Sequence, residues 1–269
     1  MKSNHLTNIP AVSFFALAML LSPPAFAGDE SKVSGYVGLG LLMAPEYEGA
    51  DDLGVAPLIS GRVNYQQFYI ETNGLGVRAN VSPLKFIEFG PVLSYTFGRD
   101  SEVENQKVKR MRELDAAVSA GAFIRVPFFE VMDKTDELAF DLQATSDVSD
   151  TSDGSTFSFG PSYSFSPIEN LRLGVSASAT YATDDYNQPY FGVDADNAAR
   201  SGLAVYKAEG GFKDVGLMLN ANYALNESWG ITGIAGYKQL IGDAADSPIV
   251  DKEGNAGQVV FGAGVSYSF

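Results

Sequence analysis

Cysteine is absent from the 269-residue sequence, and histidine occurs once, as His5. Without cysteine the chain can form no disulfide, and it has no thiolate to act as a nucleophile or a zinc ligand. Without a histidine beyond position 5, the rest of the chain lacks the base of Ser–His hydrolases and the commonest zinc ligand. We therefore predict a protein that is not an enzyme and that carries no cofactor, no metal and no catalytic residue. Residue counts alone leave acid–base catalysis by paired carboxylates open, but nothing in the sequence places a specific pair together.

Long hydrophobic runs are also scarce. The single long run, from Ala11 to Leu21, follows Lys2 and is followed by small residues that end at Ala27. It is shorter than the roughly 20 residues that a membrane-spanning helix needs, whereas a charged start, a short apolar centre and a small-residue cleavage site are typical of a secretory signal peptide. We predict that residues 1–27 are cleaved after export through the Sec pathway, and that residues 28–269 form one domain.

Basic residues are few relative to acidic ones. Lys and Arg number 18 against 33 Asp and Glu, which gives a formal net charge of −15. This charge argues against nucleic acid and against an anionic membrane surface as partners. Many carboxylates gather between strand-like segments, as in Glu46–Asp52, Asp184–Asp196 and Asp243–Glu253. Any pore through the protein should therefore prefer cations, because acidic side chains would set the field at its mouth.

What the sequence has in abundance is strict alternation of apolar with small or polar residues, the pattern of a β-strand with two different faces. The clearest examples are Leu171–Tyr181 and Gln258–Phe269. Asn73–Gly74, between two such segments, is a strong signal for a two-residue hairpin. The strand-like segments are residues 32–43, 56–64, 67–72, 75–81, 86–98, 116–127, 138–147, 155–166, 171–181, 211–225, 229–241 and 258–269.

A soluble β-sandwich would show the same alternation, but two features favour a membrane barrel. Short and long connections mostly alternate along the chain, as they do in outer-membrane barrels. The polar faces also carry isolated charges, which can pair inside a lumen but would each cost roughly 2–4 kcal/mol at mid-depth against lipid. We predict an all-β, antiparallel up-and-down transmembrane barrel of about twelve strands, with short periplasmic turns and longer acidic outer loops, in the outer membrane of a Gram-negative cell.

Charged residues on the polar faces are the first candidate site. The candidate lumen charges are Arg62, Arg78, Glu88, Arg125 and Asp141. They would either line a conducting path or pair with one another and plug the lumen, and the sequence leaves both alternatives open.

A second candidate site is the connection Phe128–Glu137, which is long for a periplasmic turn. It places apolar residues beside charges, as in the centre and rim of a protein interface. Phe129, Val131, Met132 and Lys134 are its candidate partner-binding residues. The alternative is that the two phenylalanines belong to the aromatic girdle of the barrel and that the rest is a solvated turn.

Tyr267 and Phe269 lie on one face of the final strand-like segment. Aromatic rings at a strand end suit the membrane–water interface, where one side of the ring is dry and the other is wet. We expect these two residues to act as an assembly signal for the barrel assembly machinery.

The long connections carry weaker signals. Arg99–Asp115 is highly charged, and we expect a solvated helix or a disordered loop there. Tyr47, Gly49 and Ser201–Gly202 suit loop packing better than a ligand pocket. The aspartates of Asp184–Asp196 lack the spacing of a calcium-binding loop. We expect instead a solvated acidic rim, bridged to lipopolysaccharide by divalent ions.

Several loop stretches resemble the MipA/OmpV family of outer-membrane proteins, whose members are similar to MltA-interacting protein. These stretches are Ala44–Asp51, Tyr190–Val193, Ala199–Leu203 with Tyr206, and Tyr237–Val250. The resemblance implies an outer-membrane barrel without enzymatic activity. One branch of the family is associated with scaffolding of murein synthesis, joining a lytic transglycosylase to a penicillin-binding synthase, and other members are described as antigens, adhesins or porin-like proteins. We therefore expect a scaffold of the cell envelope, with a passive, cation-preferring small-solute channel as the alternative.

Overall fold

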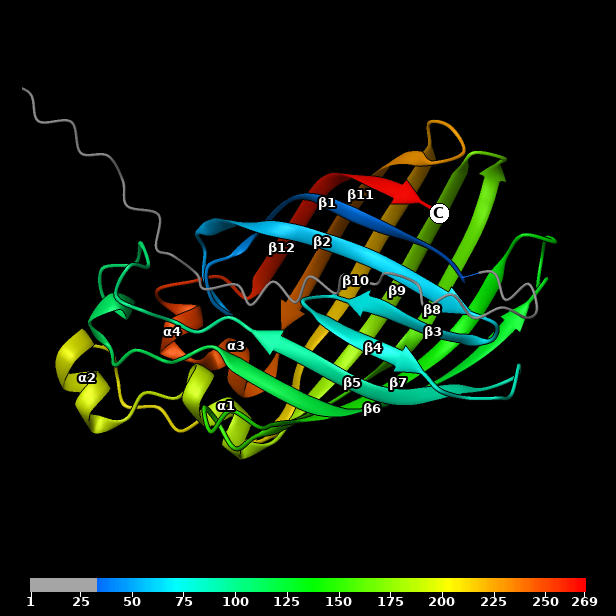
Figure 1. Ribbon diagram of the computed structural model, residues 1–269. Coiled ribbons are helices and arrows are strands. Elements are labelled where there is room, and N and C mark those ends of the chain that lie inside the picture. The colour runs from blue at the N-terminus through cyan, green and yellow to red at the C-terminus, as the bar shows by residue number, and fades with distance from the viewer. Residues whose placement is uncertain (1–32) are drawn as a thin grey trace, which may run out of the picture. The chain divides into compact units, whose positions relative to one another are not determined.

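The computed structural model describes residues 33–269, which form a closed antiparallel barrel of twelve strands (Figure 1). Each strand pairs with its neighbours in the sequence, and β1 pairs with β12 to close the barrel. The predicted signal peptide, residues 1–27, lies outside the described residues. The strands are β1 (Val33–Pro45), β2 (Leu53–Tyr65), β3 (Phe68–Asn73), β4 (Gly76–Asn80), β5 (Glu88–Thr96), β6 (Ala117–Phe129), β7 (Glu137–Asp147), β8 (Ser155–Ile168), β9 (Leu171–Ala182), β10 (Gly211–Ala224), β11 (Trp229–Leu240) and β12 (Gly257–Ser268).

The apolar face of the strands points outward. Leu39 of β1 lies opposite Val265 of β12, and these side chains are 64% and 54% exposed in the isolated chain. In lipid such a surface is dry, and a closed barrel leaves no strand edge with unpaired backbone groups. The predicted all-β barrel of about twelve strands is confirmed.

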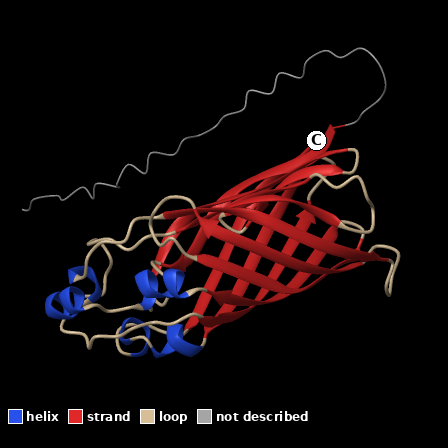
Figure 2. Ribbon diagram, turned by 90° about the horizontal axis from the view of Figure 1, so that it is seen from below, coloured by secondary structure: helices blue, strands red, loops and turns tan. Residues whose placement is uncertain are grey.

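The two ends of the barrel differ. Figure 2 shows the helices gathered at one end, while short turns join the strands at the other. Because short turns face the periplasm in outer-membrane barrels, the helical end is the outer end. No helix within residues 33–269 is both long and apolar enough to cross a membrane. The helices are the 3₁₀ turn η1 (Val108–Arg110), α1 (Asp184–Phe191), α2 (Ala195–Ser201), α3 (Gly242–Asp246) and α4 (Pro248–Asp251).

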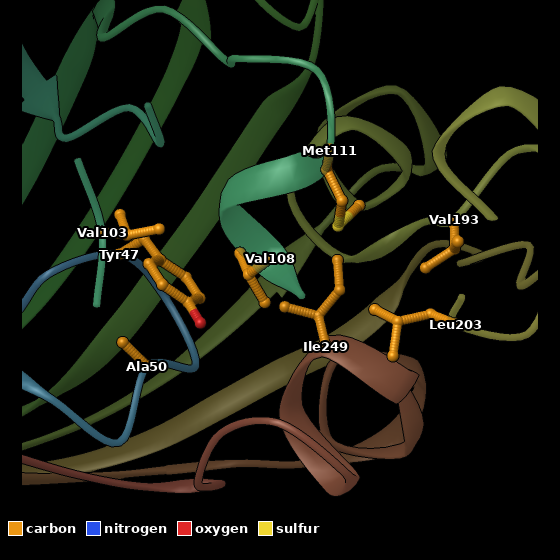
Figure 3. Close-up of a cluster of buried hydrophobic side chains, with 8 residues drawn as sticks. All are labelled: Tyr47, Ala50, Val103, Val108, Met111, Val193, Leu203 and Ile249. Atoms are coloured by element: carbon orange, nitrogen blue, oxygen red, sulfur yellow. The ribbon is translucent and has the colours of Figure 1, made fainter. Parts of the chain in front are cut away.

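The outer loops pack against one another and form an outer cap with two hydrophobic clusters. Four loops, residues 46–52, 97–116, 183–210 and 241–256, contribute to the first cluster (Figure 3). Its members are Tyr47, Ala50, Val103, Val108, Met111, Val193, Leu203 and Ile249. The second cluster consists of Ala182, Tyr186, Tyr190, Phe191, Ala208, Leu240, Ala244 and Val250.

The expectation of a solvated or disordered loop at Arg99–Asp115 is wrong. Val103, Val108 and Met111 are buried in the outer cap. The charged neighbours of these residues dominate the local composition. The apolar partners come from loops far away in the sequence, and local patterning does not reveal them.

Candidate functional site

A contact between Arg78 of β4 and Asp141 of β7 crosses the inside of the barrel. Arg78 Nη1 donates to Asp141 Oδ1 over 2.9 Å, and Arg78 Nε donates to Glu71 Oε1 over 2.7 Å. Because β5 and β6 separate β4 from β7 in the barrel wall, side chains of these strands can meet only across the lumen.

Further ion pairs extend this contact in both directions. Arg62 Nη1 lies 3.0 Å from Glu71 Oε2. At the other end, Arg125 Nη2 pairs with Glu137, and Arg125 Nε lies 3.6 Å from Glu88 Oε2 and 4.0 Å from Asp141 Oδ1. We call the set Arg62, Glu71, Arg78, Glu88, Arg125, Glu137 and Asp141 the lumen network.

The lumen network is supported by aromatic rings. The guanidinium carbon of Arg62 lies 3.7 Å from the ring centre of Tyr69, and that of Arg78 lies 4.6 Å from the ring centre of Phe123. The Tyr69 hydroxyl donates to Glu88 Oε2 over 2.7 Å. Hydrogen bonds and cation–π contacts of this kind offset the desolvation of charges that are only partly exposed.

All five sequence-predicted lumen charges lie in this network, and each has an oppositely charged partner. Sequence reasoning missed Glu71 and Glu137. The predicted two-residue turn at Asn73–Gly74 is one residue too early, because Asn73 pairs with Gly76 and the turn is Gly74–Leu75. The observed register places Glu71 opposite Arg78, whereas the predicted turn would have placed it opposite Gly76. The register between β2 and β3 also places Glu71 opposite Arg62.

A polar cavity of about 650 Å³ occupies the periplasmic end of the lumen. Arg62 and Arg125 of the lumen network border it, together with Asn222 of β10 and Ser266 of β12. The lumen is therefore hollow on its periplasmic side and crossed by ion pairs farther in.

Polar contacts stabilise the outer cap in addition to its two hydrophobic clusters. The side chain of Gln258 accepts from Gly49 N and donates to Ala50 O, both over 3.0 Å. Gly49 has a φ of +95°, and a Cβ there would come 2.5 Å from Val250 Cγ2. Tyr47, with 5% exposure, lies within the first cluster. Of the sequence-predicted loop residues, Tyr47 and Gly49 thus serve packing.

The periplasmic connection between β6 and β7 is an ordered turn, Glu130–Asp136. Asp136 Oδ1 accepts from Val131 N over 2.7 Å. Its Oδ2 accepts from Met132 N over 2.9 Å and from Asp133 N over 3.0 Å. Burial alone would raise the pKa of Asp136, but a hydrogen bond from the Tyr163 hydroxyl and these backbone N–H groups hold it below its usual value. The carboxylate therefore organises the whole turn.

The predicted partner residues lie in two different places. Val131, Met132 and Lys134 are exposed at the turn, and Met132 is 83% exposed. Phe129 is the last residue of β6 and does not belong to the turn. The predicted connection began at Phe128, two residues before the observed turn, because nothing in the sequence Phe128–Phe129 shows where the strand ends. Sequence reasoning also missed Asp136, which has no special local pattern.

The predicted assembly residues lie at the seam that closes the barrel. The Tyr267 and Trp229 rings meet edge to face with centres 5.2 Å apart. Phe269 N donates to Gly35 O and Gly35 N donates to Phe269 O, both over 3.0 Å. Phe269 thus adds one more backbone pair between β1 and β12, while its ring stays 52% exposed.

Acidic side chains in the loops serve local structure. Asp194 accepts from Asn197 N at the start of α2, over 2.8 Å. This backbone bond, together with Arg112, lowers the pKa of Asp194 despite some burial. Within residues 33–269, no three acidic side chains gather in a way that would hold a metal ion.

Comparison with known proteins identifies relatives by sequence. The chain is 40% identical over 93 residues to outer membrane protein OmpV of Vibrio cholerae serotype O1, covering 35% of this chain and 34% of that protein. It is 32% identical over 87 residues to MltA-interacting protein of Escherichia coli K12, covering 32% and 34%. The chain thus spans about a third of the length of these relatives.

Solved structures give a looser likeness. An outer membrane channel from Pseudomonas putida F1 aligns with a TM-score of 0.45 at 10% identity, over 93% of this chain and 100% of that one. The KdgM porin aligns with a TM-score of 0.36 at 10% identity, over 88% and 99%. Similarities this low carry no argument about function.

The decisive match is to a whole family. The family model of MltA-interacting protein MipA covers residues 37–269, which is nearly the complete barrel. The Vibrio cholerae relative is named an outer membrane protein, in keeping with the apolar outer face of this barrel. The chain is therefore an outer-membrane β-barrel that belongs to the MipA family.

Proposed function

We propose that this barrel is a non-enzymatic scaffold of the outer membrane, and that it docks periplasmic proteins through the turn Glu130–Asp136. The observation that carries the proposal is the order of this turn. Asp136 fixes three consecutive backbone N–H groups, while Met132 at the tip stays 83% exposed. A preorganised loop with an apolar tip loses little conformational entropy on binding, which favours docking.

The interior supports a scaffold over a passive channel. Arg78 and Asp141 join across the lumen, and the outer loops share two hydrophobic clusters above it. Passive diffusion needs a continuous water-filled path, which packed loops and crossing ion pairs obstruct. The polar cavity at the periplasmic end offers space on one side of the network only.

The partner class follows from the relatives. The E. coli K12 relative is named MltA-interacting protein. The family resemblance adds a lytic transglycosylase and a penicillin-binding murein synthase. Both kinds of enzyme would meet this barrel at its periplasmic turns, and among these turns Glu130–Asp136 presents an ordered apolar tip. We therefore propose murein enzymes of these two classes as its partners.

A site-specific photo-crosslinker tests the proposal in cells. Placed at Met132, it should capture a periplasmic protein, and mass spectrometry should identify a murein enzyme. The matched control is the same group at Glu227, which is exposed in the periplasmic turn between β10 and β11. Replacing Val131–Lys134 by Gly and Ser should abolish capture by a crosslinker at Glu130, which is exposed in the same turn outside the replaced segment, while the barrel stays folded.

Equal capture at Met132 and Glu227, or capture that persists after the Gly/Ser replacement, would contradict the docking role of this turn. Planar-bilayer recordings test the channel alternative on the same protein. A scaffold with an obstructed lumen should give no steady conductance. A steady, cation-selective conductance would favour the small-solute channel instead.

A further inference from the structure

An unpaired arginine lies inside the outer cap. Arg99 follows β5, and its backbone exchanges two 2.7 Å hydrogen bonds with Leu114. Its side chain is 5% exposed, and its Nη1 donates to Tyr190 O over 3.1 Å. The guanidinium carbon also lies 5.9 Å from the ring centre of Tyr47. These partners are a neutral carbonyl and an aromatic face.

Arg99 differs in this respect from the arginines of the lumen network. Within residues 33–269, no carboxylate lies within 4.0 Å of its guanidinium group, and its buried Nε has no hydrogen-bond partner. Its Nη2 also forms no hydrogen bond in this part of the chain. Burial without a counter-charge lowers the pKa of Arg99. A buried charge without a partner is unfavourable, so such groups are found where a bound ligand supplies the missing counter-charge.

A pocket of about 280 Å³ opens beside Arg99, between the loop 97–116 and the loop 183–210. Gln188 of α1 lines it, and its Oε1 accepts from Ala208 N over 2.9 Å. The amide NH₂ of Gln188 then has no acceptor within residues 33–269. Gly192 is required here, because a Cβ would come 2.4 Å from the backbone oxygen of Gln188. Two unengaged donors, from Arg99 and Gln188, therefore border one pocket.

The other charged residues of the pocket are already engaged. Arg112 pairs with Asp194, and Glu113 Oε1 accepts from the Ser101 hydroxyl over 2.9 Å. Among the described residues that line the pocket, Arg99 is therefore the cation without a paired carboxylate, while Glu113, which bonds only to a neutral hydroxyl, keeps its negative charge at the pocket wall. Leu114 and Pro189 add apolar surface to its wall.

We propose that this pocket binds a small carboxylate with a short apolar portion. Nη2 of Arg99, which forms no hydrogen bond within residues 33–269, would donate a charge-assisted hydrogen bond to one oxygen of the carboxylate. The amide NH₂ of Gln188 supplies a second donor, and Leu114 with Pro189 covers the hydrocarbon portion. The volume limits the ligand to a few carbon atoms. This site lies at the outer end of the barrel and is independent of the periplasmic docking turn.

The test uses the complete barrel in detergent micelles and isovalerate as the probe. Isothermal titration should detect binding of isovalerate and none of isovaleramide, which has the same shape without the charge. Inorganic phosphate should bind less tightly than isovalerate, because the pocket wall is partly apolar. Equal binding of isovalerate and isovaleramide, or of neither, would overturn the proposal, and this comparison needs no variant.

Single substitutions test whether Arg99 is the residue that binds the carboxylate. Arg99→Gln should weaken isovalerate binding by about tenfold or more, the usual effect of losing a hydrogen-bonded charge. Arg110→Gln is the matched control, since Arg110 lies in the same loop and is exposed. Gln188→Ala should weaken binding less than Arg99→Gln does. Wild-type affinity in Arg99→Gln, or an equal loss in Arg110→Gln, would refute the role of Arg99.

Discussion

Lys213 Nζ lies 2.6 Å from Glu48 Oε1, and this contact ties β10 to the loop that follows β1. Lys213 is 3% exposed. Its other partner is Asp214, whose Oδ2 lies 2.8 Å away. Lys238 of β11 lies 3.9 Å from Glu48 Oε1, and the Tyr186 hydroxyl of α1 donates to Glu48 Oε2 over 3.0 Å. Glu48 thus joins the cap loops to the top of the barrel wall.

Glu48→Gln should loosen the outer cap while leaving the barrel intact. Glutamine keeps the size of the side chain but removes the charge that Lys213 and Lys238 face, at a cost of about 1–3 kcal/mol. We expect faster hydrogen exchange and easier proteolysis in the loops 46–52 and 183–210. Asp51→Asn is the matched control, since Asp51 is exposed in the same loop. Wild-type exchange in Glu48→Gln would show that the contact does not hold the cap.

The same contact predicts a pH dependence. Burial alone would raise the pKa of Glu48, but Lys213 and Lys238 hold it below its usual value of 4.5. A carboxyl group with a lowered pKa in the folded state stabilises that state fully above its unfolded-state pKa, and this contribution disappears as the pH falls through the folded-state pKa. Asp214 and Tyr186 also face Glu48. We therefore expect cap opening, measured by hydrogen exchange, to be constant above about pH 5 and to increase below it.

Glu48→Gln supplies the control for this pH dependence. The variant has no ionisable group at position 48, so acidification should open its cap less than it opens the wild-type cap. The same acid-induced change in both proteins would assign the effect to other carboxylates.

Arg78→Met should open the lumen and destabilise the barrel. It removes the contact across the lumen to Asp141 and leaves two carboxylates of the lumen network without their shared partner. Breaking one side of a partly buried ion pair costs up to about 3–5 kcal/mol. We expect a higher single-channel conductance than that of the wild type, and a lower unfolding temperature. Arg172→Met is the control, because Arg172 is exposed and bonds to Ser164 and Thr135.

An unchanged conductance in Arg78→Met would show that the network does not obstruct the lumen. A stability loss in Arg172→Met as large as that in Arg78→Met would assign the effect to any change of charge inside the barrel.

Asp136→Asn should disorder the periplasmic turn without unfolding the barrel. An amide offers one oxygen where the carboxylate offers two, so it cannot accept all the hydrogen bonds that Asp136 accepts from the turn and from Tyr163. We expect about tenfold faster amide exchange at Met132 and Asp133, as for the loss of a charged acceptor. Glu130→Gln is the matched control, since Glu130 is exposed in the same turn. Unchanged exchange in Asp136→Asn would contradict the organising role of Asp136.

The strands were predictable because the information for them is local. Alternation over about ten residues separates a lipid-facing side from a lumen-facing side, as Leu171–Tyr181 illustrates. Glu71 was not within reach, because the hairpin signal at Asn73–Gly74 pairs it with Gly76, whereas the turn one residue later pairs it with Arg78.

The outer cap was not predictable in the same way. Gly49 bonds to Gln258, 209 positions away, and Arg99 bonds to Tyr190, 91 positions away. Contacts of this kind depend on which loops the closed barrel brings together, and no periodicity in a loop encodes them. The pocket beside Arg99 arises from the same loop packing, so the sequence showed only a charged connection there.

Phe269→Ala separates a role in assembly from a role in stability. The substitution keeps the backbone pairing of Phe269 with Gly35 and removes only a half-exposed ring. If the ring is an assembly signal, the amount of heat-modifiable barrel in outer membranes should fall severalfold, while the purified variant refolds in detergent as the wild type does. Phe86→Ala is the matched control, since Phe86 is 68% exposed in the periplasmic connection between β4 and β5. Equal losses for Phe269→Ala in cells and in refolding would show that the ring stabilises the barrel seam and does not serve as a signal.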